Sequence, residues 1–290
     1  MLRLPSAHHE IVAVSNLQLS VQRSDDDSSL SGIRGVLLDL DGVLYVGDRL
    51  IEGAIEAIEQ IRAAGIVKRF ITNTSTLSRA TLLNRLGRLG LDIPSDELFA
   101  APQATAAYLR EQTAIGSVHL LLADDVKQDF AEFHQVPLAV ADCIVAGDIG
   151  DAWSCDLLNQ VFNRLVAGAR LIVIHKNRFW QTEQGLRMDL GGFVAALEYC
   201  SGVQAVVMGK PSAAFFKAAL NDMGLASEAT AIVGDDIYSD VQGGQQAGLT
   251  GVLVRTGKYR QSHVESTGVH PDRVIDSIAD LPRLLGLNQR

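Results

Sequence analysis

The chain has 290 residues, 47% of them hydrophobic, which is enough to bury one large domain or two smaller ones. It carries 25 basic and 34 acidic residues, a formal net charge of −9, which argues against a broad nucleic-acid surface and against binding to acidic membranes. No stretch approaches the roughly 18 to 20 apolar residues of a membrane span, and the N-terminus lacks the apolar core of a secretory signal. We therefore expect a soluble, cytoplasmic protein.

The three cysteines, Cys143, Cys155 and Cys200, are odd in number and lack the spacing of a metal site. They suit a reducing compartment. Their apolar or helical surroundings predict three buried thiols.

The first 32 residues stand apart from the rest of the chain. A polar cluster at residues 23–29 ends a weakly patterned segment, which predicts an N-terminal tail. Within it, Ile11 to Val14 predicts an edge strand or a loose segment.

Next comes an apolar run from Gly35 that breaks into Asp39, Asp41 and Gly42. It predicts a strand buried on both faces and followed by a tight turn. If the backbone is still extended there, the two carboxylates point the same way.

A helix is predicted over residues 51–64, because Ile51, Ala54, Ile55 and Ile58 share one helical face and Gly65 is placed as a stop. A strand over residues 66–71 follows. Strand, helix and strand at this spacing form a βαβ unit, so the two strands should be parallel.

Helices are predicted over residues 77–90 and 102–112. From about residue 101 to 205 the chain again alternates strands and helices, which is enough for a small α/β domain. The predicted strands cover residues 118–122, 143–146 and 171–174, and a helical stripe comprises Leu158, Val161, Phe162 and Leu165.

Three more strands are predicted over residues 205–208, 230–233 and 251–254. Pro211 is placed in the first turn of a helix that follows the first of them. Further helices are predicted up to about Ala247 and over residues 278–285.

Polar side chains follow four of these strands. Because the carboxyl ends of parallel strands meet at one sheet edge, we expect them to form a pocket for a metal and an anion. Oxygen ligands favour a hard cation, most simply Mg²⁺, and phosphoryl transfer with a carboxylate nucleophile fits such a pocket. The candidate residues are Asp39, Asp41, Thr72, Asn73, Lys210, Asp235, Asp236 and Asp240.

In this order the motifs Asp39-Leu40-Asp41-Gly42, Thr72, Lys210 and Gly234-Asp235-Asp236 with Asp240 resemble those of the haloacid dehalogenase superfamily of phosphatases. The resemblance implies Asp39 as nucleophile and metal ligand, and Asp41 as general acid and base with its backbone carbonyl on the metal. It implies a third protein ligand in Asp235. It also implies that Thr72, Asn73 and Lys210 bind the phosphoryl group, and that Asp236 and Asp240 lie around the site and support its ligands.

Between Thr72 and Lys210 lie 137 residues, the position of the large α/β cap in one class of this superfamily. The resemblance therefore implies a Rossmann-like parallel-sheet core at residues 33–100 and 206–290, with the cap inserted at residues 101–205. Four segments, at residues 196–199, 209–212, 234–236 and 254–259, resemble the group that includes phospholysine phosphohistidine inorganic pyrophosphate phosphatase and the N-acetylglucosamine operon phosphatase. Some members carry serine at the position of Asp41, so the acid here favours hydrolysis of ordinary phosphate esters.

The resemblance also implies that the cap selects a small phosphorylated substrate, that residues 185–192 face the active site, and that a homodimer forms through the cap. Within the cap, Arg187 either contacts an anionic substrate or is solvated. His175 and Lys176 form a polar pair at the end of a cap strand, which is more typical of a loop than of a functional site. Packing in a core or dimer interface is favoured over ring stacking for Trp153, Phe179 and Trp180.

The favoured function is a Mg²⁺-dependent phosphatase that works through an aspartyl-phosphate on Asp39. The alternatives are a phosphotransferase or mutase, a pyrophosphate or phospho-amino-acid phosphatase, and a non-catalytic phosphate-binding scaffold.

Overall fold

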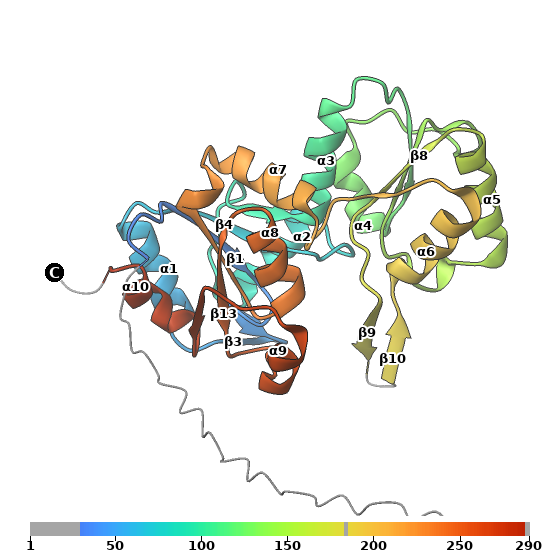
Figure 1. Ribbon diagram of the computed structural model, residues 1–290. Coiled ribbons are helices and arrows are strands. Elements are labelled where there is room, and N and C mark those ends of the chain that lie inside the picture. Colours follow the sequence, from blue (N-terminus) through green and yellow to red (C-terminus); the bar gives the residue numbers. More distant parts are fainter. Residues whose placement is uncertain (1–29, 183–184, 288–290) are drawn as a thin grey trace, which may run out of the picture.

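The computed structural model describes residues 30–182 and 185–287, which form a core and an inserted cap (Figure 1). The core is built on a six-stranded sheet in which all neighbouring strands are parallel. Every residue of its central strand is buried, as the apolar run predicts for a strand covered on both faces. In spatial order the strands are β14 (Arg273–Ile275), β13 (Thr250–Val254), β12 (Thr230–Gly234), β1 (Gly35–Asp39), β4 (Val67–Thr72) and β5 (Leu98–Ala100).

Helices cover both faces of this sheet. One apolar cluster joins the sheet to α1 (Ala54–Ala63), α2 (Arg79–Arg88) and α10 (Leu281–Leu284), and a second joins it to α3 (Ala101–Glu111) and α7 (Ala213–Met223). The remaining core elements are α8 (Gly243–Gln246), α9 (Gln261–Thr267), the six-residue π-helix Ile237–Gln242, the 3-10 helices Ser227–Ala229 and Ile278–Asp280, and the hairpin of β2 (Tyr45–Val46) with β3 (Arg49–Leu50).

The cap has its own parallel sheet of four strands. Helices α5 (Cys155–Val166) and α6 (Leu190–Ser201) pack together on one face, and the short α4 (Asp124–Lys127) follows the first strand. An antiparallel hairpin of β9 (Phe179–Thr182) and β10 (Gly185–Met188) projects from the cap beside the core (Figure 1). The sheet strands are β11 (Val206–Val207), β8 (Arg170–Val173), β7 (Cys143–Ala146) and β6 (Val118–Leu121).

The carboxyl edges of the two sheets face each other across a buried hydrogen bond. Ser75 follows β4 of the core, His175 follows β8 of the cap, and Ser75 Oγ lies 3.0 Å from His175 Nε2. The backbone N–H of Asn177 donates to His175 Nδ1, so the ring proton sits on Nε2 and points to Ser75. Burial lowers the pKa of His175, which keeps it neutral at this junction.

The α/β class and the parallel-sheet core are confirmed. Sequence patterns miss the short edge strands β5 and β14 and both hairpins, because two to four residues are too few for a period to show. The proposed boundary at residue 101 falls at the start of α3, which packs against α7 of the core as well as against cap residues.

Several local predictions need correction. Ile55 is 40% exposed, because the buried face of α1 runs through Ala54, Ala57, Ile58 and Ile61 instead. Pro211 lies before the helix rather than in its first turn, since Ser212 is the N-cap and α7 begins at Ala213.

The prediction of three buried thiols is wrong for two of them. Cys155 and Cys200 are exposed on α5 and α6, whereas Cys143 lies inside the cap sheet. The proposed strand Ile11–Val14 lies outside the described residues. None of the helices in the described ranges has both the length and the hydropathy needed to cross a membrane.

The core predicts one stability effect. Phe215 is fully buried in α7, with its ring 5.7 Å from that of Phe99 and 5.6 Å from that of Phe216. We expect Phe215→Ala to lower the free energy of unfolding by about 3 to 5 kcal/mol, because it opens a cavity between sheet and helix. Urea denaturation measures this. The control Val166→Ala, at a side chain that is 61% exposed, should change it by less than about 0.5 kcal/mol; equal losses would contradict the packing.

Candidate active site

The predicted polar residues do meet at the carboxyl edge of the core sheet. Asp39 is the last residue of β1, Thr72 is the last residue of β4, and Asp235 directly follows β12. Lys210 enters from the segment that returns from the cap after β11. All four side chains are buried, so charged groups of both signs share a space with little water.

Lys210 connects two of the carboxylates. Its Nζ lies 2.8 Å from Asp39 Oδ1 and 2.6 Å from Asp240 Oδ1. Burial alone lowers the pKa of Lys210, but the two carboxylates outweigh it and the pKa is raised. The lysine is therefore a permanent positive charge beside Asp39.

Asp235 has one carboxylate oxygen without a partner. Its Oδ2 accepts a 2.6 Å hydrogen bond from the backbone N–H of Lys258, whereas the buried Oδ1 finds no donor among the described residues. Burial, and then the charge of Asp39, raises the pKa of Asp235 to about 6. A buried anionic oxygen with no donor is costly unless a cation binds it.

Two glycines allow the backbone to close around Asp235. A Cβ at Gly42 would lie 1.9 Å from Asp235 Oδ2, and a Cβ at Gly257 would lie 2.1 Å from the same oxygen. Both glycines have positive φ, +87° and +57°, which other residues rarely adopt. The Thr256 hydroxyl also donates to Gly42 O, so the loop after β13 and the turn after β1 hold each other beside the carboxylate.

Asp41 is exposed, unlike Asp39, because β1 ends at Asp39 and the chain turns at Gly42. The expectation that both side chains point the same way, which assumes an extended backbone, stays a prediction; the charge of Asp39 still acts on the Asp41 carboxyl group. Burial of part of the group raises the pKa of Asp41, the charge of Asp39 adds to this, and Lys258 and Arg85 oppose it. A raised pKa favours a carboxyl group that can carry a proton.

Asp240 and Asp236 serve the local structure. Asp240 Oδ1 binds Lys210, and its Oδ2 accepts from the backbone N–H of Asp236, so both oxygens are engaged. Asp236 Oδ1 accepts from the N–H groups of Tyr238 and Ser239 and caps the π-helix. These contacts fix the orientation of Lys210 and of the loop after β12.

Thr72 and Asn73 are placed differently from each other. The Thr72 hydroxyl lies at the carboxyl edge of the core sheet, 2.9 Å from the Thr74 hydroxyl. The Asn73 side chain instead binds the backbone of Lys210, with Nδ2 donating to Lys210 O at 2.9 Å and Oδ1 accepting from Lys210 N–H at 2.8 Å. In this structure, therefore, Asn73 positions Lys210.

The site fits a hard divalent cation. Asp39, Asp235 and Asp240 each offer an oxygen, and these atoms lie within 4.8 Å of one another. Lys210 and a backbone N–H already bind the two oxygens of Asp240. The Asp235 oxygen that has no donor among the described residues and the carboxylate of Asp39 are therefore the better metal ligands. A site made of carboxylate oxygens with no His or Cys suits Mg²⁺.

The segment Thr256 to Lys258, which closes the site after β13, is part of the family resemblance, but the sequence patterns did not assign it to the site. The Lys258 side chain is 64% exposed, with its Nζ 3.9 Å from Asp236 Oδ2. The available signal was a Thr-Gly-Lys sequence one residue after a buried strand, since glycine near such a strand end allows a close backbone approach. The link between Ser75 and His175 was also missed, because it joins residues 100 positions apart.

This fold and this arrangement of carboxylates agree with comparisons to known families. A model described as haloacid dehalogenase-like hydrolase matches residues 36–135, and a HAD-hydrolase-like model matches residues 207–281. The relatives described next are similar over most of the chain. The chain belongs to the haloacid dehalogenase-like hydrolases, and within them it is a phosphatase.

Two curated relatives and two solved structures illustrate the likeness. Human phospholysine phosphohistidine inorganic pyrophosphate phosphatase is 38% identical over 262 residues, covering 88% of this chain and 95% of the relative. Bovine haloacid dehalogenase-like hydrolase domain-containing protein 2 is 39% identical over 239 residues, covering 82% and 90%. The 4-nitrophenylphosphatase of Thermotoga maritima superposes with a TM-score of 0.81 at 26% identity, covering 88% and 98%. NagD of Escherichia coli superposes with a TM-score of 0.77 at 27% identity, covering 86% and 98%.

Replacing Gly257 tests the packing around Asp235. We expect Gly257→Ala to lower kcat/KM at least about tenfold, because the new methyl group must push the Asp235 carboxylate or the Gly42 turn out of place. The matched control is Gly268→Ala, which has a similar φ of +69° but no atom near its Cβ. It should cost about 1 kcal/mol of stability and leave kcat/KM unchanged. Equal activity of the two variants would contradict the packing.

The pKa of Asp235 predicts how Mg²⁺ binding depends on pH. Because its pKa is raised from 3.8 to about 6 in the folded protein, the ion-free protein loses stability from this group as pH rises from about 4 to 6. Mg²⁺ requires the ionised carboxylate, so we expect its affinity to be about tenfold lower at pH 5 than at pH 7 and nearly constant above pH 7. Isothermal titration calorimetry at pH 5, 6 and 7 measures this. Asp236→Asn should keep the dependence; a constant affinity in the native protein would contradict it.

Proposed function

We propose that the chain hydrolyses a small phosphorylated metabolite with Mg²⁺, through an aspartyl-phosphate on Asp39. The observation that carries the proposal is the buried Asp39 carboxylate, whose Oδ1 forms an ion pair with Lys210 Nζ. The nearby Asp235 Oδ1 has no hydrogen-bond donor among the described residues. The Leu40 N–H also donates to Asp39 Oδ1. Both contacts therefore fall on one oxygen and orient the carboxylate.

In the first step a carboxylate oxygen of Asp39 attacks phosphorus, and the bond from phosphorus to the leaving oxygen breaks. Asp41 gives its proton to that oxygen, which leaves as an alcohol. The raised pKa of Asp41 supports this role, because burial and the charge of Asp39 help it to hold a proton.

In the second step water attacks the phosphorus of the aspartyl-phosphate, Asp41 takes a proton from the water, and the bond from Asp39 to phosphorus breaks. Inorganic phosphate leaves and Asp39 is free again. Lys210 balances charge in both steps, while Asn73 holds the backbone of Lys210 and Asp240 holds its ammonium group.

Asp39, Asp235 and the backbone carbonyl of Asp41 would hold Mg²⁺, which supplies positive charge that neutralises the phosphoryl oxygens. Thr72 binds the phosphoryl group in this proposal, and its buried hydroxyl at the end of β4 supports that role.

Two broader expectations belong to the proposal. A homodimer through the cap is supported by exposed apolar side chains there, including Val140, Val166 and Tyr199, the last 91% exposed. A cytoplasmic location accords with the two exposed thiols, since free cysteines persist in reducing compartments.

Phosphate release tests the function. We expect Mg²⁺-dependent release from a panel of phosphorylated metabolites and para-nitrophenyl phosphate, reduced about 10³-fold or more by Asp39→Asn, because that change removes the nucleophile. One turnover in ¹⁸O-water after phosphorylation should place ¹⁸O in the released phosphate and none in Asp39. The matched control is Asp48→Asn, which changes an exposed acid in the turn between β2 and β3; this variant should release phosphate at the native rate.

Other outcomes decide between the alternatives. Pyrophosphate, phospholysine and phosphohistidine belong on the panel because the human relative is named for them. Preference for one of these would replace the ester assignment. Transfer of the phosphoryl group to an added acceptor alcohol in preference to water would indicate a phosphotransferase, and binding of phosphate without turnover would indicate a scaffold.

A further inference from the structure

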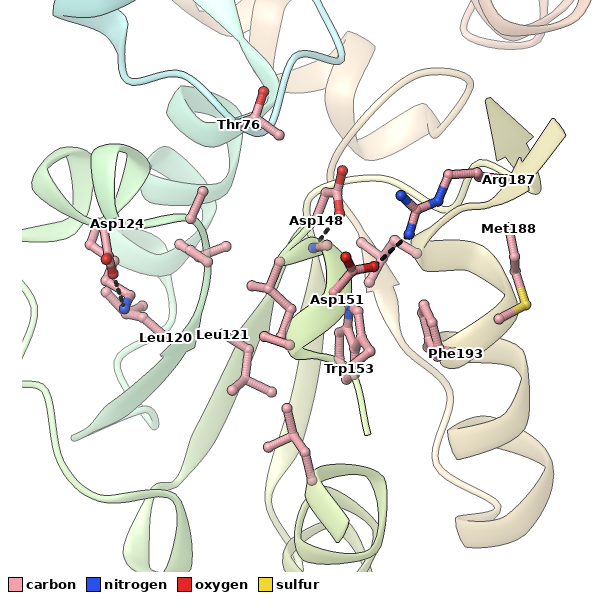
Figure 2. Close-up of a pocket in the computed structure, with 18 residues that line it drawn as sticks. Thr76, Leu120, Leu121, Asp124, Asp148, Asp151, Trp153, Arg187, Met188 and Phe193 are labelled. Carbon is pink, nitrogen blue, oxygen red and sulfur yellow. Dashed lines mark hydrogen bonds and ion pairs between the residues drawn. The ribbon is translucent and has the colours of Figure 1, made fainter. Parts of the chain in front are cut away.

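The cap contains a cavity of about 830 Å³ at the carboxyl edge of its own sheet (Figure 2). Its walls come from the end of β6, the short α4, the loop at residues 148–153 that follows β7, the start of α5, β10 and α6, while Thr76 borders it from the core. The lining residues that the structure describes include none of the catalytic carboxylates. Carboxyl edges of parallel sheets bind ligands, and this volume is that of a small-molecule site.

The floor of the cavity is apolar and aromatic. The rings of Trp153 and Phe193 stack with centroids 4.9 Å apart and planes 15° from parallel. Leu121 and Leu190 extend the apolar lining, and the exposed side chain of Met188 stands at the rim (Figure 2). Such a surface suits a planar ring, because flat rings bury most area against stacked aromatics.

Trp153 also has a polar atom without a partner. The side chain is 9% exposed, and its Nε1–H finds no acceptor among the described residues. In Figure 2 the indole lies below the ion pair of Arg187 and Asp151. Exposed ion pairs stabilise little, so an entering ligand can displace this one and offer an acceptor to the indole.

The charges around the cavity are unequal. Its lining has three carboxylates, Asp124, Asp148 and Asp151, and two cations, Lys127 and Arg187. Each cation already pairs with an acid, Lys127 with Asp124 and Arg187 with Asp151, which leaves Asp148 without a cation within ion-pair distance in the described chain. This excess of negative charge disfavours an anionic occupant.

We propose that this cavity binds the organic part of the phosphorylated substrate, and that this part is a planar ring with a hydrogen-bond acceptor and a neutral or positive charge. The inference rests on the proposed function. The loop after β4 connects the two places, since it begins at Thr72 in the catalytic site and reaches the cavity wall at Thr76. Four residues span at most about 14 Å, so one metabolite of ordinary size reaches both.

Three phenyl phosphates test the charge preference. They carry a two-carbon para arm that ends in ammonium, methyl or carboxylate. We expect kcat/KM to be about tenfold or more higher for the ammonium and methyl esters than for the carboxylate ester, with the difference in KM. Asp148→Asn should reduce the ratio of ammonium to carboxylate ester about threefold or more. The matched control Asp156→Asn, an exposed acid of α5 outside the cavity, should keep it.

A binding experiment tests the position of the ring without any turnover. In a Trp180→Phe background, Trp153 is the remaining tryptophan. We expect tyramine, the phenol released from the ammonium ester, to quench its fluorescence with saturation and to compete with para-nitrophenyl phosphate. Trp153→Phe keeps the stacking ring but removes the N–H, and should raise KM for the esters about three- to tenfold at unchanged kcat.

The outcomes separate this inference from the function. If para-nitrophenyl phosphate is hydrolysed but the three esters are equally good, or Asp148→Asn leaves their ratio unchanged, the cavity assignment is wrong and the phosphatase stands. If no ester is hydrolysed, the proposed function fails; quenching by tyramine would then show a ring site that serves no substrate, which also overturns the inference. A Trp153→Phe variant that fails to fold leaves the decision to Asp148→Asn.

Discussion

Electrostatic balance at the carboxyl edge of the core sheet is the constraint on which the rest of the structure depends. Asp39, Asp235 and Asp240 are buried close together, and Lys210 lies between two of them. Buried carboxylates repel unless cations or donors compensate them. Among the described residues no donor contacts one oxygen of Asp235, which supports the proposed binding of a divalent cation, because carboxylate oxygens are its preferred ligands.

Much of the surrounding architecture serves to hold these charges. Asn73 binds the backbone of Lys210, and the loop of Thr256 and Gly257 closes over Asp235 and the Gly42 turn. These contacts come from four different strand ends, so the sheet must form before the site exists. The cap meets this edge near Ser75, which contacts His175, and near Gly209, which packs against Ile174 and His175.

The cap contributes in a different way. Its sheet turns the same carboxyl edge toward the core, and the neutral His175 bonds to Ser75 at the junction. The cavity beside this contact combines an apolar aromatic floor with excess negative charge, unlike the catalytic edge, where cations must meet a phosphoryl group. In the binding mode proposed above, this separation lets one substrate present its phosphoryl group to the core and its organic part to the cap.

The α/β class, the central strands and the polar residues at the carboxyl edge of the core sheet could be predicted from the sequence, because buried parallel strands are continuous apolar runs and their ends carry the polar groups. Contacts between distant parts of the chain set the surroundings of each of these residues: Asp41 is exposed while Asp39 is buried, Asn73 holds Lys210, and Gly257 packs on Asp235. The exposure of Cys155 and Cys200 was decided in the same way. These outcomes depend on contacts between residues far apart in the chain, and local periodicity carries no information about which distant side chain will be the neighbour.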